Sequence, residues 1–326
     1  MRHLLLVFLL AVSAFAQTDE PKLPAGDAIR INEFYRVAGS VQDQIWPGWS
    51  KVPAPLMLVT PAGEFLTHHP SPPKEWKKVG DDVYAGPHQF PVTFQATFPV
   101  FGSQPVIVIG APENTASKYS TPWLFTVMHE HFHQLQYAQP GYFESVNALG
   151  LSHGDGSGMW MLNYPFPYEK PETTRAFAQL RNLLLLTVNE KDAAEFQKLA
   201  KRYIELRKKF FGQLSPDDHK YFSFQLWQEG IARYTEVKSA EAGARYQPTA
   251  EFAALADFEP FSDRAAKART ETLHELQQAD LATWKRTVVY SFGAAEGFLL
   301  DRLHPNWKDE YFRRMLSMDS FFEPAQ

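Results

Sequence analysis

Hydrophobic positions near the N-terminus repeat first with the period of a helix and then with the spacing of strands. Residues 29–46 carry their apolar side chains on one stripe and stop at Pro47 and Gly48, which predicts an amphipathic helix. Apolar runs of strand length follow at 56–60, 64–68, 92–98 and 105–110. Apolar and polar residues alternate along 92–98, and this alternation indicates a sheet with one covered face.

The rest of the chain is dominated by the helical period. Thr121 and Pro122 are typical of a helix start and Pro140-Gly141 of a stop, so 122–138 is expected to form a helix that packs on the sheet. Further helices are predicted at 172–189, 191–211, 216–239, 262–279, 281–303 and 307–318. The pattern therefore predicts an α+β protein, with a β-rich part over 17–120 and a helical part over 121–326.

Residues 140–170 are rich in glycine, proline and aromatic residues and follow neither period. Long irregular segments inside compact domains often have a binding role. This segment is therefore expected to form either a wall of a substrate cleft or a packed cover over the surface.

The first sixteen residues have the features of a secretory signal peptide. Residues 1–16 combine a basic start, an apolar stretch and an Ala-Phe-Ala cleavage site before Gln17. The sequence thus predicts an exported protein, periplasmic or extracellular after cleavage. No later apolar run has the length of a transmembrane helix, so no membrane span is expected in the mature chain.

Charge and cysteine content narrow the classes of partner and metal site. A net charge of −5, with lysine and arginine scattered along the chain, is not typical of proteins that bind nucleic acid or anionic membranes. The chain has no cysteine, which excludes disulfides and leaves histidine and carboxylate as the available zinc ligands.

The clearest chemical motif lies within the expected helix 122–138. His129, Glu130 and His133 form an H-E-x-x-H pattern. Residues four apart lie one turn above each other on a helix, so the two imidazoles can reach one Zn²⁺ ion. Glu130 would then stand beside the open coordination position and act as general base toward a zinc-activated water. His131 faces elsewhere and is expected to pack or to face solvent.

A catalytic zinc site needs a third protein ligand, and several residues are candidates. Metzincins are excluded, because Gln136 and Gln139 stand where that class has a glycine and a third histidine. The preferred candidate is Glu229, in an apolar segment with helical spacing. The alternatives are His153 and Asp155 in a glycine-rich turn, and Glu144.

The segment around Glu229, Leu-Trp-Gln-Glu-Gly-Ile-Ala-Arg-Tyr-Thr-Glu, resembles the third-ligand helix of gluzincin metallopeptidases, especially the aminopeptidase N family. In that family a Glu-Gly pair is followed by a tyrosine and an acidic residue, and Tyr234 and Glu236 occupy those places. The resemblance implies a zincin-like helical part and a zinc peptidase activity. Glu229 is farther from His133 than in the family, so residues 140–215 would loop out and return to the site.

A second resemblance to the same family precedes the motif helix. Gly-Ala-Pro-Glu-Asn at 110–114 is similar to a Gly-Ala-Met-Glu-Asn motif whose glutamate binds the free amine of a substrate. Pro112 departs from that motif and removes a backbone donor. Glu113 is therefore expected either to bind an amine or to belong to a loop after a buried strand, and we favour the loop.

Two supporting roles are expected at such a centre, the first of them implied by the gluzincin resemblance. A tyrosine or histidine must stabilise the oxyanion opposite the metal, and the candidates are Tyr290, Tyr234 and Tyr164. Metal-bound imidazoles also need an acceptor for the second ring proton, and Glu236 or Glu296 is expected to provide it.

The sequence as a whole predicts an exported zinc metallopeptidase with a peptide or protein substrate. The alternative is an exported binding or scaffold protein whose zinc site is structural or vestigial. Glu130 favours catalysis, because a structural site closes with a fourth ligand instead of keeping a base beside an open position. Cleavage specificity and oligomeric state are left open.

Overall fold

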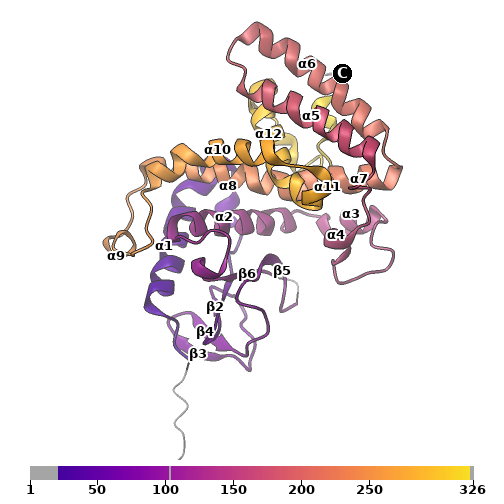
Figure 1. Cartoon of the computed structure of the whole chain (residues 1–326). Coiled ribbons are helices and arrows are strands. Elements are labelled where there is room, and N and C mark those ends of the chain that lie inside the picture. Colours follow the sequence, from indigo (N-terminus) through magenta and orange to yellow (C-terminus); the bar gives the residue numbers. More distant parts are fainter. Residues whose placement is uncertain (1–20, 103, 324–326) are drawn as a thin grey trace, which may run out of the picture.

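The computed structural model describes residues 21–102 and 104–323 (Figure 1). The expected signal peptide at 1–16 lies outside these residues. In the described part of the chain, no helix has both the length and the apolar character needed to cross a membrane. The protein is of the α+β class: a mixed sheet lies at one side and helices account for 59% of the chain.

The sheet has six strands in the order β3-β4-β2-β1-β6-β5. Their bounds are β1 Leu56–Thr60, β2 Gly63–Thr67, β3 Lys77–Gly80, β4 Val83–Gly86, β5 Gln95–Pro99 and β6 Pro105–Gly110. β1 and β6 are parallel, and the other neighbours are antiparallel. The predicted strands are therefore present, with 92–98 shortened and shifted, whereas β3 and β4 were not predicted.

Both faces of the sheet are covered, which corrects the expectation of one covered face. Leu58 of β1 belongs to the main core shared with the helices, and its neighbour Met57 belongs to a second, smaller core around Trp76. On β5 the apolar Phe98 packs against the smaller core. The polar side of β5 faces the motif helix, where Thr97 bonds to the helix directly.

Most of the longer helices lie where the helical period predicted them. They are α1 Ala25–Ile45, α2 Ser120–Tyr137, α5 Pro171–Asn189, α6 Ala193–Gly212, α7 Pro216–Gln225, α8 Ile231–Ala242, α10 Phe261–Gln278 and α12 Val288–Leu303. The short ones are α3 Tyr142–Ala148, α4 Trp160–Asn163, α9 Ala250–Ala253, α11 Leu281–Trp284 and α13 Lys308–Tyr311.

Three predicted helices differ from the structure. The helix expected at 216–239 is interrupted by a π-helical turn, Leu226–Gly230, between α7 and α8. The helix expected at 281–303 breaks at Lys285, whose φ is 50°, and continues through a 3-10 turn into α12. The helix expected at 307–318 is limited to the short α13.

The motif helix α2 lies between the sheet and the other helices (Figure 1). α2 contacts β5 and β6 on one side and α8 on the other, while α8 in turn packs against α10 and α12. α5 and α6 form a hairpin at the far side. Residues between α2 and α7 thus extend away from the motif helix, and the chain returns to it at α8. The main core includes residues of both the N-terminal and the helical part.

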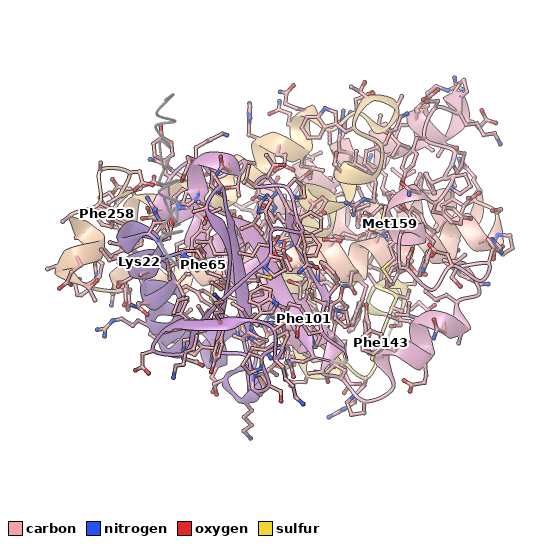
Figure 2. The ribbon with its side chains drawn as sticks, turned by 90° about the horizontal axis from the view of Figure 1, so that it is seen from below. Lys22, Phe65, Phe101, Phe143, Met159 and Phe258 are labelled. Atoms are coloured by element: carbon pink, nitrogen blue, oxygen red, sulfur yellow. The ribbon has the colours of Figure 1, made fainter. Side chains whose placement is uncertain are left out.

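The irregular segment divides into an exposed and a packed portion. Phe143, Met159 and Leu162 are 44%, 49% and 49% exposed. Figure 2 shows Phe143 and Met159 toward the end of the molecule opposite Phe258. Farther along, Tyr164 stacks on the buried Tyr221. Residues 164–168 are therefore a packed cover.

Two glycines set the distance between α12 and the π-helical turn. A Cβ atom built on Gly293 would lie 2.5 Å from the Cα of Gly230, and one built on Gly230 would lie 2.6 Å from the Cα of Gly293. Real Cβ atoms do not approach backbone so closely, so neither position tolerates a side chain without movement. This contact places the start of α12 beside Glu229.

We therefore expect Gly293→Ala to destabilise the fold, because its methyl group meets backbone that cannot move aside. The expected loss in free energy of unfolding is about 1–3 kcal/mol. Gly39→Ala in α1 is the matched control: a Cβ atom at this position would have no neighbour within 4 Å, and the variant should gain about 0.5–1 kcal/mol. Urea denaturation measures both. Equal stabilities for the two variants would contradict the tight contact.

Candidate metal centre

The two motif histidines lie on one face of α2, and both are buried. His129 and His133 are 4% and 5% exposed, and their ring centroids are 5.0 Å apart. α2 is held deep in the molecule because apolar residues on its other faces fill the main core. The helix therefore carries both imidazoles into the interior, where α8 packs on it and Tyr290 of α12 stacks on His129.

Glu229 reaches the same point from the π-helical turn. Its Oε2 lies 3.3 Å from Nε2 of His133 and 3.6 Å from Nε2 of His129. The three ligand atoms lie within 4.8 Å of one another, and they form the one group of at least three such residues found across 21–102 and 104–323. Extra residues in π-helical turns often occur at functional sites. The turn here directs the Glu229 carboxylate toward α2.

The second ring nitrogens of the histidines have different surroundings. Nδ1 of His133 lies 2.7 Å from Oε1 of Gln136. The Gln136 amide nitrogen donates to the carbonyls of Trp227 and Gln228, so its Oε1 is left as an acceptor. The amide nitrogen of Gln228 also lies 3.1 Å from this Nδ1, but the shorter contact with the Gln136 acceptor favours a proton on Nδ1 of His133. The lone pair is then on Nε2, which faces Glu229.

Glu236, and not Glu296, lies beside the other histidine. Oε2 of Glu236 is 3.4 Å from Nδ1 of His129, close enough for an ion pair but without hydrogen-bond alignment. Glu296 instead binds Arg207 at 2.6 Å and accepts from Tyr203 in a fully buried cluster. The expectation that Glu296 could serve a zinc histidine is therefore wrong, because its carboxylate is already occupied elsewhere.

The centre has a strong preference for positive charge. Burial alone would lower the pKa of His129, but the adjacent carboxylates of Glu229 and Glu236 outweigh it and raise the pKa to about 9. Burial likewise opposes ionisation of Glu229, yet the neighbouring histidines and Arg286 hold its pKa well below the usual range. A cation placed between these groups would replace the imidazole proton in neutralising the carboxylates.

The strand β5 holds the carboxylate of Glu130. The hydroxyl of Thr97 donates to Oε2 of Glu130 at 2.8 Å, and the amide nitrogen of Gln95 donates to Oε1 at 3.3 Å. Glu130 is 4% exposed. Both of its oxygens therefore have a donor, which fixes the orientation of the carboxylate.

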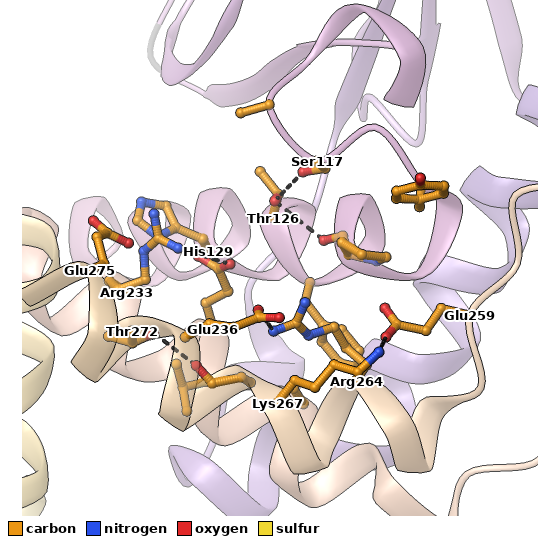
Figure 3. Close-up of a pocket in the computed structure, with 18 of the residues that line it drawn as sticks. Ser117, Thr126, His129, Arg233, Glu236, Glu259, Arg264, Lys267, Thr272 and Glu275 are labelled. Carbon is orange, nitrogen blue, oxygen red and sulfur yellow. Dashed lines mark hydrogen bonds and ion pairs between the residues drawn. The ribbon is translucent and has the colours of Figure 1, made fainter.

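A cavity of about 670 Å³ opens beside His129 and runs between α2, α8 and α10. Figure 3 shows His129, Arg233 and Glu275 at one end of it and Lys267 with Glu259 toward the other. Apolar side chains, charged groups of α10, and Gln95 and Tyr290 line the rest. No lining residue comes from 140–170, so α8 and α10 form the wall of this cavity and the first of the two alternatives for that segment does not hold here.

Of the three candidate tyrosines, only Tyr290 lies at the centre. Its ring is stacked on that of His129, with centroids 5.9 Å apart, and it lines the cavity. The hydroxyl of Tyr234 donates to Asp301 at 2.7 Å, on the side of α8 that faces α12. The hydroxyl of Tyr164 donates to Asp218. Neither Tyr234 nor Tyr164 is brought to the cluster.

The alternative third ligands also stay outside the cluster. His153 and Glu144 are exposed. Asp155 accepts hydrogen bonds from the backbone of Ser157 and Trp160, which is the role of a turn residue. Glu113 is exposed in a 3-10 turn, Pro112–Asn114, and is absent from the cavity lining.

Two residues at the centre were missed by sequence reasoning. Tyr137 stacks on His133 and donates to the carbonyl of Thr97 at 3.2 Å. It lies four residues after His133, so helical spacing could have identified it. Arg286 binds Glu229 and Tyr290 from a turn between two helices. No motif or spacing rule pointed to it.

Comparisons with protein-family models, with curated proteins and with solved structures each found no match for this chain. Its function is therefore inferred from the residues and their geometry.

The geometry predicts which substitution would prevent a metal from binding at this group of residues. Glu229→Ala should weaken zinc binding by more than the about 10- to 100-fold loss typical when a residue supporting a ligand is removed. Asp155→Ala is the control and should bind zinc like the wild type, because Asp155 only orders its own turn. Chelator competition measures both affinities. An unchanged Glu229→Ala with a weakened Asp155→Ala would exclude Glu229 as a ligand.

Proposed function

We propose that this protein is an exported zinc-dependent metallopeptidase of gluzincin type, with His129, His133 and Glu229 as metal ligands and Glu130 as general base. The observation that carries the proposal is the group of two buried imidazoles on α2 and one half-buried carboxylate on the π-helical turn. Export rests on the signal-peptide features of residues 1–16. Zinc, the zincin-like helical part and the peptide substrate rest on the motif and its resemblance.

The two separations measured from Glu229 suit a tetrahedral zinc ion. Zinc–nitrogen and zinc–oxygen bonds of about 2.0–2.1 Å place neighbouring ligand atoms roughly 3.3–3.4 Å apart. The separations from Glu229 to the histidines, 3.3 and 3.6 Å, are close to this value. Two histidines with one carboxylate are also a known ligand set of catalytic zinc.

Each residue then has a defined part in hydrolysis. Bound zinc would supply a water of lowered pKa and an electrophile for the carbonyl. Glu130, held by Thr97 and Gln95, accepts the proton of the attacking water and delivers it to the leaving amine. Tyr290, stacked beside His129, donates a hydrogen bond from its hydroxyl to the developing oxyanion and keeps its proton.

A catalytic centre explains the surroundings better than a structural one. Structural zinc sites close with four protein ligands, whereas the group in the described residues has three members beside a cavity of about 670 Å³. A binding or scaffold protein would also have no use for a buried carboxylate held by two donors next to the ligands.

One prediction of the proposed function concerns the general base. Glu130→Gln should keep zinc and lose hydrolysis of a peptide library by about 10²–10⁴-fold, because it removes a proton acceptor and leaves the ligands intact. Metal analysis and cleavage assays on the same preparation measure the two effects. Full activity in this variant would overturn the catalytic assignment.

The second prediction separates two modes of peptidase action. Glu113 lies outside the cavity lining, so we expect N-acetylated peptides to be cleaved and Glu113→Ala to change their turnover little. A charge-assisted contact with a free amine would instead be worth about 1.5–3 kcal/mol. Matched free and acetylated peptides, with both proteins, decide the question. Cleavage of the free peptide alone, lost in Glu113→Ala, would make the enzyme an aminopeptidase.

A further inference from the structure

Arg286 occupies an unusual position beside the proposed metal centre. It lies in the 3-10 turn Lys285–Thr287, at the break between α11 and α12. Its side chain is 19% exposed, so most of the guanidinium is inside the protein. The contact between Gly293 and Gly230 sets the approach of α12 to the π-helical turn and brings Arg286 within reach of Glu229.

The guanidinium binds the side of Glu229 that faces away from the histidines. Nη1 of Arg286 lies 3.4 Å from Oε1 of Glu229 and 3.3 Å from Oε1 of Gln225. Oε2 of Glu229 is the oxygen that lies near the histidine nitrogens. The two oxygens of one carboxylate thus have separate partners. A carboxylate whose second oxygen is bound to arginine has less tendency to bind a metal through both oxygens.

The same guanidinium also fixes Tyr290. Nη2 of Arg286 donates to the Tyr290 hydroxyl at 3.2 Å, and the guanidinium lies 5.5 Å from the ring centroid. Because the phenol oxygen accepts this bond, its own proton remains free to donate elsewhere. A phenol that accepts from a cation is polarised and becomes a stronger donor.

Arg233, the other guanidinium near the ring of Tyr290, cannot replace Arg286. It lies 5.9 Å from the ring centroid, and its partner is Glu236 at 3.5 Å. Arg233 is therefore paired with the carboxylate of Glu236, on the side of the centre where Glu236 approaches His129. Arg286 is the group that connects the third ligand to the tyrosine.

We propose that Arg286 is a positioning residue that keeps Glu229 bound to the metal through one oxygen and orients the Tyr290 hydroxyl toward the substrate oxyanion. This inference rests on the proposed zinc peptidase function. It assigns Arg286 two separable effects, one on the metal coordination and one on the stabilisation of the transition state.

The test compares Arg286→Gln and Arg286→Lys with the wild type after cobalt(II) is substituted for zinc. The visible spectrum of cobalt(II) reports the number of ligands. We expect Arg286→Gln to shift it toward higher coordination, as Glu229 binds through both oxygens. We also expect kcat to fall about 10- to 100-fold with KM nearly unchanged. Arg286→Lys should be intermediate, and added guanidinium should partly restore the kcat of Arg286→Gln.

Two further variants keep the outcome clear. Tyr290→Phe should lower kcat without changing the cobalt spectrum, because it removes the donor and leaves Glu229 held. Lys285→Ala is the control. Lys285 precedes Arg286 and is also positively charged, but its ammonium pairs with the exposed Glu169. This variant should therefore behave like the wild type. Circular dichroism verifies that all variants are folded.

Each contrary result has a distinct meaning. If Arg286→Gln has the cobalt spectrum and the kcat of the wild type, Arg286 is not a positioning residue. The proposed peptidase function is not affected by this result. A rise in KM with kcat unchanged also overturns the positioning role, because Arg286 would then bind substrate. A wild-type protein that takes up neither zinc nor cobalt overturns the proposed function itself, and the role of Arg286 with it.

Discussion

The structure depends on burying a helix that carries many polar side chains. α2 has histidines, a glutamate and glutamines among its buried residues. Buried polar groups are costly unless they are hydrogen-bonded, so the surroundings of α2 must supply partners. Thr97 of β5 binds Glu130, and Gln134 donates to the carbonyls of Pro55 and Pro105. The position of the sheet against α2 is therefore fixed by polar contacts as well as by apolar packing.

On the opposite side of α2, the polar side chains find hydrogen-bond partners in elements that are distant in sequence. Gln136 donates to two carbonyls of the π-helical turn, and Gly230 of that turn touches Gly293 of α12. One chain of contacts thus leads from α2 through the turn to α12. Glu229 and Arg286 reach the histidines as a consequence of this packing. The proposed ligand set is assembled by the same contacts that close the core.

Sequence patterns could predict the features that depend on local spacing. The helical period of α2 was enough to predict that both histidines share one face. Glu229 could be predicted because it lies in an apolar segment of helical spacing with a recognisable pattern. The strands β3 and β4 were missed because they are short and largely without buried apolar residues. The choice between Glu236 and Glu296 depended on which partner Arg207 takes, and Arg286 depended on a helix break at Lys285. Both arrangements depend on tertiary packing, which a local sequence pattern does not predict.

The central claim is that His129, His133 and Glu229 hold one zinc ion. A crystal structure of the mature protein grown with zinc, with diffraction recorded on both sides of the zinc absorption edge, tests it most directly. We predict a single strong anomalous peak about 2.0–2.1 Å from Nε2 of both histidines and from Oε2 of Glu229. A fully occupied peak elsewhere, or a peak at this place without Glu229 among its ligands, would contradict the claim.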